Sequence, residues 1–357
     1  MNQRTGILLV NLGTPSTPSI IGLWKFLREF LSDGRVIDLP SIIRAILLYG
    51  LILPTRPFKI KPAYQSIWTE KGSPLLVFHE QLLTKIQHKL PHIPIVLGMR
   101  YGTPSIRAGL NTLKNNGCNN IVCIPLFPQY ATASTGSAVA KIYEEAAKWW
   151  DPPSIQVMMD FHNQSEFIDL HTSLIHERLA HCKVDAILYT FHGIPVRHLK
   201  KSGCMHASSC QQHSCPVSDF KNYRCYKRQC VETARLIHDR TQVQLPYFIA
   251  FQSRLGKTEW IKPYLDEELI RLKNLGYKNL LLVSPSFTAD CLETLEELCI
   301  RAKETWEKLC PDGSLNVTSS LNDKDAWALT LVSWICKKIQ SDYINETYND
   351  EEVTVYN

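Results

Sequence analysis

The amino-acid sequence predicts an α/β fold of two similar Rossmann-like halves, each a parallel sheet flanked by helices. Short apolar runs alternate with amphipathic helical patterns along the chain. The runs are apolar at almost every position, which is typical of parallel strands covered on both faces. The chain also repeats parts of itself, which indicates that the two halves share one architecture.

Each expected element follows from its local pattern, apolar runs for strands and 3.6-residue periodicity for helices. The expected strands are Ile7–Asn11, Pro94–Arg100, Asn120–Leu126, Ala186–Phe191, Tyr247–Phe251 and Asn279–Ser284. The expected helices are Ser105–Asn115, Ser137–Trp149, Glu166–Leu179, Gln229–Arg240, Asp290–Leu309 and Lys324–Ile339. Most of the strands are followed by a helix, which is the order that builds parallel sheets.

Two pairs of segments carry the internal repeat. Ile7–Pro15 resembles Ala186–Pro195, and Leu113–Pro125 resembles Leu272–Pro285. The sequence offsets of the two pairs differ, which indicates duplication with insertions rather than a solenoid. Two such halves facing one another would form a cleft at the carboxyl ends of their strands, the usual ligand site of parallel sheets.

Length and composition limit the domain count and the function classes. The 357 residues suggest two domains, and a hydrophobic fraction of 45% excludes a disordered chain. The formal net charge of +5 is small and spread along the chain, so nucleic acid is not an expected partner. We expect halves at 1–160 and 161–340, with a cysteine-rich insertion at 202–225 and an acidic, solvated tail at 341–357.

The apolar segments and the cysteines bear on the compartment. The first residues are too short an apolar stretch for a signal peptide, and no segment approaches the roughly 20 apolar residues of a membrane span. The strongest candidate, Ser41–Leu53, is short and contains Arg44. We therefore expect a cytoplasmic protein. Thiols stay reduced there, so clusters among the twelve cysteines indicate metal binding rather than disulfides.

Three acidic residues follow the last expected strand. Asp290, Glu293 and Glu297 are spaced i, i+3 and i+7, which would place their carboxylates on one helix face. One interpretation is a solvated face whose first acids favour the helix dipole. The other is a metal-handling stripe, because oxygen ligands suit a divalent cation that must be released. The spacing leaves both open.

A histidine lies at the matching place in the other repeat. His192 ends the strand Ala186–Phe191 and precedes Gly193 and Pro195, so we expect its side chain in the cleft. It could be a hydrogen-bonded structural residue or a base. The repeat favours the base, because strand ends of both halves would face one cleft. The residues thus predict a cleft with a histidine and an acidic helix, without naming a substrate.

Nine short motifs in order carry a resemblance to a known family. They are Val10–Pro15, Phe30–Pro40, Gly72–Leu75, Met99–Gly102, Pro125–Tyr130, Ser134–Ser137, Phe191–Pro195, Phe251–Gly256 and Phe287–Leu298. From about Gly6 to Ile339 the chain resembles the ferrochelatases, enzymes that insert ferrous iron into a porphyrin to make haem. The resemblance implies a two-domain chelatase fold, a porphyrin cleft, and Fe²⁺ and protoporphyrin IX as substrates.

The resemblance also assigns roles to residues. His192 matches the family's active-site histidine and Glu293 its partner, both expected to contact iron. Because insertion releases two pyrrole protons, His192 would accept protons, and Asp290 and Glu297 would conduct protons or metal. The positions that match the porphyrin cleft, each also compatible with packing or surface charge, are Leu12, Arg35, Arg100, Tyr101, Tyr130 and Trp260. Arg35 is expected to pair with a propionate.

The segment that matches the family's mobile lip, and two positions that depart from the family's motifs, bear on the location of the protein and on its substrate. Residues 24–53 match the lip over the cleft, and their apolar content suits peripheral contact with a membrane that holds the porphyrin. Cys291 stands where many relatives carry a second histidine, so the proton or metal route would differ. Leu12 lies where coproporphyrin-using relatives have tyrosine, which favours protoporphyrin IX.

The insertion at 202–225 concentrates cysteines in a hydrophilic segment. Four thiolates would suit an iron–sulfur cluster, and some members of the family carry [2Fe–2S]. The expected ligands are Cys204, Cys210, Cys215 and Cys225. Zinc with His206 or His213, and no metal at all, are the alternatives. Cys230 lies on a helix that resembles one whose cysteine occurs without clusters.

Rival functions stay open at this point. A coproporphyrin-using enzyme, or one inserting another metal or tetrapyrrole, would share the fold. A non-catalytic haem or metal carrier could use the same cleft, and it would keep its function after His192→Ala. The sequence leaves monomer and homodimer undecided.

Overall fold

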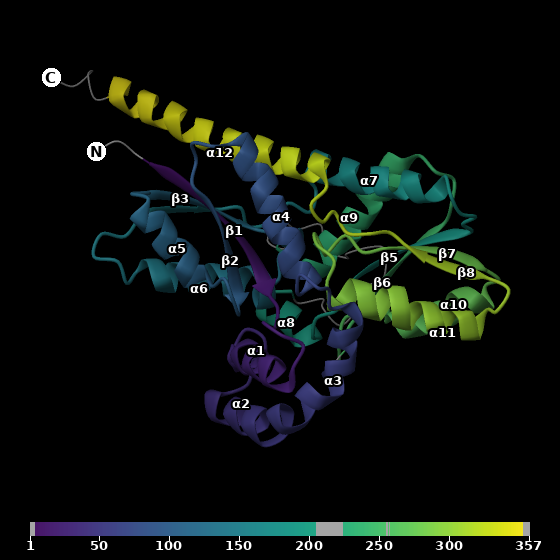
Figure 1. The fold of residues 1–357 in the computed structure, drawn as a ribbon. Helices are drawn as coiled ribbons and strands as arrows, with labels where there is room; N and C mark the ends of the chain where they lie inside the picture. The colour runs from purple at the N-terminus through teal and green to yellow at the C-terminus, as the bar shows by residue number, and fades with distance from the viewer. Residues whose placement is uncertain (1–3, 205–223, 255, 257, 353–357) are drawn as a thin grey trace.

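Two parallel four-stranded sheets form the framework of the protein in a computed structural model that describes residues 4–204, 224–254, 256 and 258–352. The first sheet has the order β2-β1-β3-β4, and the second has the matching order β6-β5-β7-β8 (Figure 1). The strands of the first sheet are β1 (Thr5–Gly13), β2 (Ile95–Tyr101), β3 (Asn120–Pro125) and β4 (Ser154–Val157). Those of the second are β5 (Ala186–His192), β6 (Tyr247–Gln252), β7 (Asn279–Val283) and β8 (Ser314–Val317). The predicted α/β class with two similar halves is confirmed.

The central strands form because their side chains are buried on both faces. Residues Ile7 to Val10 of β1 and Ala186 to Tyr189 of β5 have no exposed surface, as expected for helix-covered parallel strands. The short edge strands β4 and β8 were not predicted. The exposed or half-buried positions of β4 explain why its sequence carries no continuous apolar run.

The outer face of each sheet has its own helical layer. Helices α5 (Ile106–Asn115) and α6 (Ser137–Ala146) pack on the first sheet. The second sheet is covered by α10 (Leu265–Asn274), the π-helix η4 (Leu292–Ala302) and α11 (Lys303–Leu309). These layers come from the segments whose periodicity predicts helices, apart from α10, which the sequence analysis did not include.

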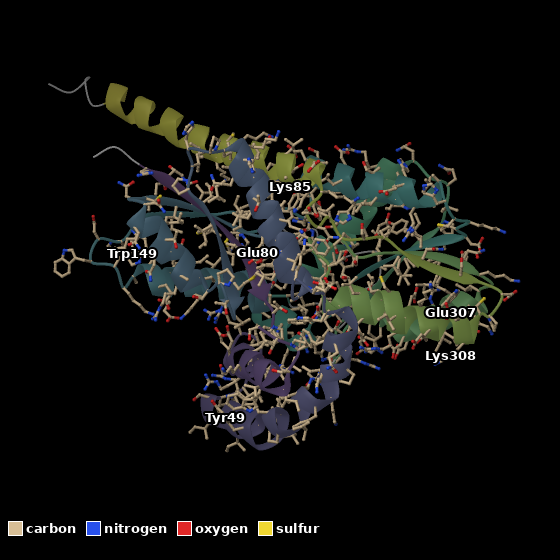
Figure 2. All side chains as sticks on the ribbon, viewed as in Figure 1. Tyr49, Glu80, Lys85, Trp149, Glu307 and Lys308 are labelled. Atoms are coloured by element: carbon tan, nitrogen blue, oxygen red, sulfur yellow. The ribbon has the colours of Figure 1, made fainter. Side chains whose placement is uncertain are left out.

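The inner faces of both sheets share one hydrophobic core. That core includes apolar residues of α4 (Pro74–Lys89), α7 (Ser165–Leu179), α9 (Tyr226–Thr241) and α12 (Asp325–Glu352). Helix α12 returns from the second half to lie across α4 (Figure 1). At this crossing Lys85, labelled in Figure 2, pairs with Asp323 at 3.0 Å and Asp325 at 2.9 Å. The predicted boundary near residue 160 falls between β4 and α7. The core between the sheets takes residues from both sides of this boundary, whereas each outer helical layer packs on an apolar cluster of its own half.

The ends of the predicted tail and lip differ from expectation. Helix α12 continues to Glu352, so most of the tail predicted at 341–357 is helical, and it projects from the body (Figure 1). The lip predicted at 24–53 falls on α1 (Ile20–Ser32), α2 (Ser41–Leu47) and the π-helical turn η1 (Leu48–Ile52), and α3 (Leu53–Ile67) continues it, so we use the name lip for all four elements. A cluster of leucines, including Leu27, Leu48 and Leu53, holds these elements together.

Helix α2, the turn η1 and α3 follow one another without a break and form one helical stretch with an unusual composition. Among the described residues, the segment Ser41–Ile67 is long and apolar enough to cross a membrane, yet only 17% of its most apolar window is buried. This criterion is weak evidence for a span. Tyr49, which is labelled in Figure 2, belongs to the lip and lines a hollow together with Thr14 and Gly102, which directly follow β1 and β2.

Candidate active site

His192 is the last residue of β5, at the edge where the strands of the second sheet end. Its Nδ1 lies 2.6 Å from the carbonyl oxygen of Gly193. A carbonyl can only accept, so Nδ1 carries the proton and the Nε2 lone pair is left to act as a base or a metal ligand. The structure therefore places the predicted histidine in the chemically useful tautomer.

The surroundings of His192 hold its backbone in place. The Tyr226 hydroxyl donates to the His192 carbonyl oxygen at 2.7 Å. The imidazole lies between Trp260, at 6.3 Å between ring centroids, and Phe287, at 6.5 Å. A Cβ added at Gly193 would come within 2.9 Å of the Gln252 carbonyl oxygen and 3.1 Å of the Trp260 ring, which explains why a glycine follows the histidine. Trp260, predicted as a cleft residue, thus stands beside His192.

The helix expected over Asp290–Leu309 is present from Leu292 to Leu309, but its acidic first part is a π-helix rather than an α-helix and it starts two residues later than predicted. The π-helix η4 begins at Leu292, and α-helical geometry begins only at Lys303. Because π-helical hydrogen bonds span five residues, each turn holds more residues than an α-helical turn. Glu293 and Glu297, four residues apart, consequently stand nearly above one another on successive turns.

Asp290 does not share this face, because it precedes the helix. Its carboxylate accepts hydrogen bonds from the Asn322 amide at 2.7 Å, the Thr294 hydroxyl at 2.9 Å and the Ser320 backbone at 3.2 Å. These bonds tie the start of η4 to the loop before α12. The carboxylate predicted to conduct protons or metal is therefore occupied by internal hydrogen bonds.

Glu297 is held in place by two residues that the sequence analysis did not assign to the site. Its Oε2 accepts from the Gln252 amide at 3.2 Å and from the Ser253 hydroxyl. Burial and then the neighbouring Glu293 raise the pKa of Glu297, whereas Ser253 and His192 oppose the increase. Glu293, Glu297 and His192 thus interact as one electrostatic group.

Gln252 is the structural link of this group. It pairs in register with His192 across β5 and β6, and its Nε2 also donates to the Glu293 carbonyl oxygen at 2.8 Å. Its Oε1 accepts from Thr190 at 2.9 Å. In the sequence, its role could have been inferred from its place at a strand end inside the motif Phe251–Gly256.

The described residues contain no group of three or more His, Cys, Asp or Glu side chains placed to hold a metal ion.

The lip reaches the same region through α3, which packs against η4. Tyr64 of α3 is buried, and burial followed by the charge of Glu293 raises its pKa. The same two causes, in the same order, raise the pKa of the Cys291 thiol. Cys291 therefore stands beside Glu293 as a neutral, buried group. Tyr64 is a neighbour of Glu293 that sequence reasoning missed.

Two of the predicted cleft residues of the first half, Arg100 and Tyr101, form a cluster around Asp33 at the base of the lip. The Asp33 carboxylate accepts from Arg100 at 2.6 Å, from Tyr101 at 3.0 Å and from Ser137. Burial opposes ionisation of Asp33, but the bonds from Ser137, the Arg35 backbone, Arg100 and Tyr101 hold its pKa below the usual range. Arg100 and Tyr101 thus support the site by holding the lip.

Arg35, Leu12 and Tyr130 lie nearer the surface of the two halves. Arg35 is exposed in the loop that contains Asp33, and Leu12 is half-buried near the end of β1. Tyr130 lines a small cavity that also takes residues of the second half, among them Ile194 and Tyr226. A separate hollow of about 570 Å³ lies beside α1 and does not include His192.

Reciprocal hydrogen bonds join the loops that follow β3 and β7. The Gln129 amide donates to the Pro285 carbonyl oxygen at 3.4 Å and to the Thr233 hydroxyl at 3.1 Å. In return, the Thr288 hydroxyl donates to the Leu126 carbonyl oxygen at 3.1 Å. The two repeats thus meet through corresponding loops.

Only two of the four predicted cluster cysteines lie within the described residues. Cys204 and Cys225 are both buried and belong to the core shared by the two sheets. Cys210 and Cys215, and the alternative ligands His206 and His213, lie outside the described residues. An iron–sulfur cluster is therefore not shown. The structure shows only that the two thiols near the ends of the insertion, Cys204 and Cys225, are buried.

The sheet order and strand-end site define the fold class of the protein as that of the chelatases. The structure is similar to that of SirB from Bacillus subtilis with Fe³⁺, at 11% identity with a TM-score of 0.54, covering 94% of this chain and 95% of that one. The sirohydrochlorin chelatase SirB from Bacillus subtilis subspecies spizizenii, in complex with cobalt, gives 11% identity and a TM-score of 0.52, covering 91% and 92%. At such identities the likeness concerns the fold alone.

The family follows from the sequence comparisons. The ferrochelatase family model matches residues 4–339. A ferrochelatase of Legionella pneumophila (strain Paris) is 47% identical over 94% of this chain and 100% of its own length. A ferrochelatase of Coxiella burnetii (strain RSA 493) is 42% identical over 95% of each chain. The chain belongs to the ferrochelatase family and is a metal-inserting enzyme, as its motifs predict.

Proposed function

We propose that this enzyme inserts Fe²⁺ into protoporphyrin IX to form protohaem, the terminal step of haem biosynthesis, with His192 and Glu293 as the reactive pair. The observation that supports this assignment is the Gln252 bridge. It pairs with His192 in the sheet while its amide holds the backbone of Glu293 and the carboxylate of Glu297. A base and two carboxylates are thereby kept together at the strand ends, where parallel sheets bind ligands.

In the proposed reaction, one Fe²⁺ ion replaces two protons of the porphyrin. Insertion removes two pyrrole N–H protons from the porphyrin and places Fe²⁺ on the four nitrogens. His192 Nε2 accepts a pyrrole proton, and Glu293 contacts the arriving ion. The ionised carboxylate of Glu297 accepts the second pyrrole proton, because burial and the adjacent Glu293 raise its pKa, and both protons then pass to solvent.

Anaerobic turnover with Fe²⁺ and protoporphyrin IX tests the assignment, followed by the loss of porphyrin fluorescence. We expect His192→Ala to abolish turnover while porphyrin still quenches tryptophan fluorescence. His79→Ala is the matched control, because His79 is a buried histidine bonded to Asn11 and Leu75 rather than to the reactive group. Full turnover by His192→Ala protein would refute the proposal. Porphyrin binding without turnover by the wild type would support a carrier instead.

We propose protoporphyrin IX rather than coproporphyrin III as the substrate because the side chain of Leu12 is apolar. This half-buried apolar side chain near the end of β1 offers no hydroxyl to a substrate carboxylate. Coproporphyrin III and Leu12→Tyr protein should therefore be assayed together. We expect protoporphyrin IX to be preferred by the wild type, with the preference reduced in Leu12→Tyr. A wild-type preference for coproporphyrin III would refute this choice.

We also propose that the protein works in the cytoplasm with its lip against a membrane surface. Ile42, Ile46 and Leu51 of the lip are 74%, 68% and 60% exposed, which is unusual for neighbouring large apolar side chains. Flotation with lipid vesicles tests this contact. We expect Ile42→Ser/Ile46→Ser protein to lose vesicle binding, whereas Ile270→Ser on α10 should keep it. Absence of flotation by the wild type would refute the contact.

A [2Fe–2S] cluster on Cys204, Cys210, Cys215 and Cys225 is proposed separately, supported by the burial of Cys204 and Cys225. Thiolate ligands of such clusters are normally shielded from solvent. Anaerobically purified protein should contain two iron atoms per chain and show visible charge-transfer bands. Cys204→Ser should remove both signals, whereas Cys182→Ser, outside the insertion, should not. Colourless, iron-free wild-type protein would refute the cluster.

A further inference from the structure

The loop between α1 and α2 connects the lip to both halves of the protein. At one end of this loop, Asp33 is bound by the first half through Arg100, Tyr101 and Ser137. At the other end, Asp38 is bound by α8 (Val196–Lys201) of the second half. The loop is therefore a strap with one carboxylate anchored on each half.

Asp38 is the acidic partner of a strongly basic helix. Its carboxylate lies 2.6 Å from Arg197 Nε, 2.8 Å from Lys201 Nζ and 3.4 Å from His198 Nε2, and its side chain is only 8% exposed. Helix α8 contains no acidic residue of its own. Burial opposes the charge of Asp38, but the bonds from Lys201 and Arg197 outweigh it and hold its pKa well below the usual range. The carboxylate thus stays ionised at neutral pH.

Helix α8 is attached directly to the His192 side of the active site. It begins at Val196, four residues after His192, and the Val196 backbone N–H donates to the Glu259 carbonyl oxygen at 3.0 Å. Pro195 forms a bridge with Trp260, the aromatic residue beside His192. A displacement of α8 would therefore move both His192 and Trp260, because a short, hydrogen-bonded segment connects them to this helix.

We propose that Asp38 is a positioning residue that couples the lip to the His192–Trp260 wall, so that both sides of the porphyrin site keep their spacing. The inference rests on the proposed function, and it takes the porphyrin to bind between the lip and His192. Asp38 contacts neither the metal-handling carboxylates nor the imidazole in the described structure. Its loss should loosen porphyrin binding and leave the metal-handling group intact.

Steady-state kinetics of Asp38→Asn test the coupling. We expect the KM for porphyrin to rise about tenfold, within the usual range of coupling between sites, with kcat and the KM for Fe²⁺ within about twofold of wild type. Asp312→Asn is the matched control, because it removes one carboxylate from an exposed ion pair with Lys278. An unchanged porphyrin KM in Asp38→Asn, or an equal rise in Asp312→Asn, would overturn the proposal.

A second variant separates positioning from general destabilisation. Arg197→Gln/Lys201→Gln removes two partly exposed cations and keeps Asp38, so it tests the same contact if Asp38→Asn fails to fold. We expect the same rise in porphyrin KM, and no further rise when Asp38→Asn is added. Additive effects would overturn the coupling. If the wild type lacks turnover, the proposed function fails, and the same comparison is made on porphyrin dissociation constants from fluorescence quenching.

Discussion

Gln252→Leu tests the bridge that assembles the active site. The substitution keeps the approximate volume of a side chain that is 3% exposed and removes its contacts with Thr190, Glu293 and Glu297. The Thr190 hydroxyl is fully buried and loses its acceptor, which costs about 1–3 kcal/mol. Losing the donor to Glu297 adds about 1 kcal/mol, so the free energy of unfolding should fall by about 3 kcal/mol in total.

Urea unfolding and iron-insertion kinetics on the same preparations measure both consequences. Because Glu297 and the Glu293 backbone lose their common anchor, kcat should fall by about tenfold to a hundredfold with little change in porphyrin KM. Thr190→Val/Gln252→Leu should recover about 1 kcal/mol, since no orphaned hydroxyl remains. A loss below about 0.5 kcal/mol in the single variant, or strictly additive effects in the double one, would refute the reasoning.

Three further variants test buried polar groups. Burial and Glu293 raise the pKa of Glu297 above 4.5, so the native state retains this proton better than the unfolded chain. The free energy of unfolding should therefore fall as the pH rises past 4.5. Glu297→Gln should remove that fall when urea unfolding is measured as a function of pH. Burial lowers the pKa of His79 to about 4, so the free energy of unfolding should fall by about 3 kcal/mol between pH 6.5 and pH 4. His79→Gln should remove most of this decrease. The same decrease in the variant as in the wild type would contradict the explanation. Gln129→Leu should lower the unfolding free energy by about 1–3 kcal/mol in the same assay, because Thr233 and the Pro285 carbonyl lose a buried partner; a neutral result would contradict that role.

Much of the fold was predictable because buried parallel strands leave a strong sequence signal. The segments at Ile7–Asn11 and Ala186–Phe191 lie at the centres of the two sheets, where every position must be apolar. The edge strands β4 and β8 are only four residues long and partly buried, so their sequences lack that pattern, whereas the edge strands β2 and β6 are longer and mostly buried and were predicted. Helix α12 was expected, but its extension to Glu352 was not, because the acidic segment after Ile339 reads as a solvated tail.

The acidic helix shows the limit of periodicity. A pattern of carboxylates at Asp290, Glu293 and Glu297 suits one face of an α-helix, and the sequence does not distinguish α- from π-helical hydrogen bonding. In the structure, Asp290 is bound by Asn322 and Ser320, residues some thirty positions away, and η4 starts only beyond it. The selection of Glu293 and Glu297 as neighbours therefore depends on tertiary contacts.

The sequence by itself determined the α/β class, the duplicated halves, the family and the strand-end place of His192, because these depend on local burial patterns and on ordered motifs. Only the tertiary structure decided which polar groups meet. Gln252 joins His192 to η4, Tyr64 brings the lip beside Glu293, and Asp38 reaches α8 across the boundary of the halves. Such pairings connect residues far apart in the chain, and their distances arise only when both sheets pack on one core.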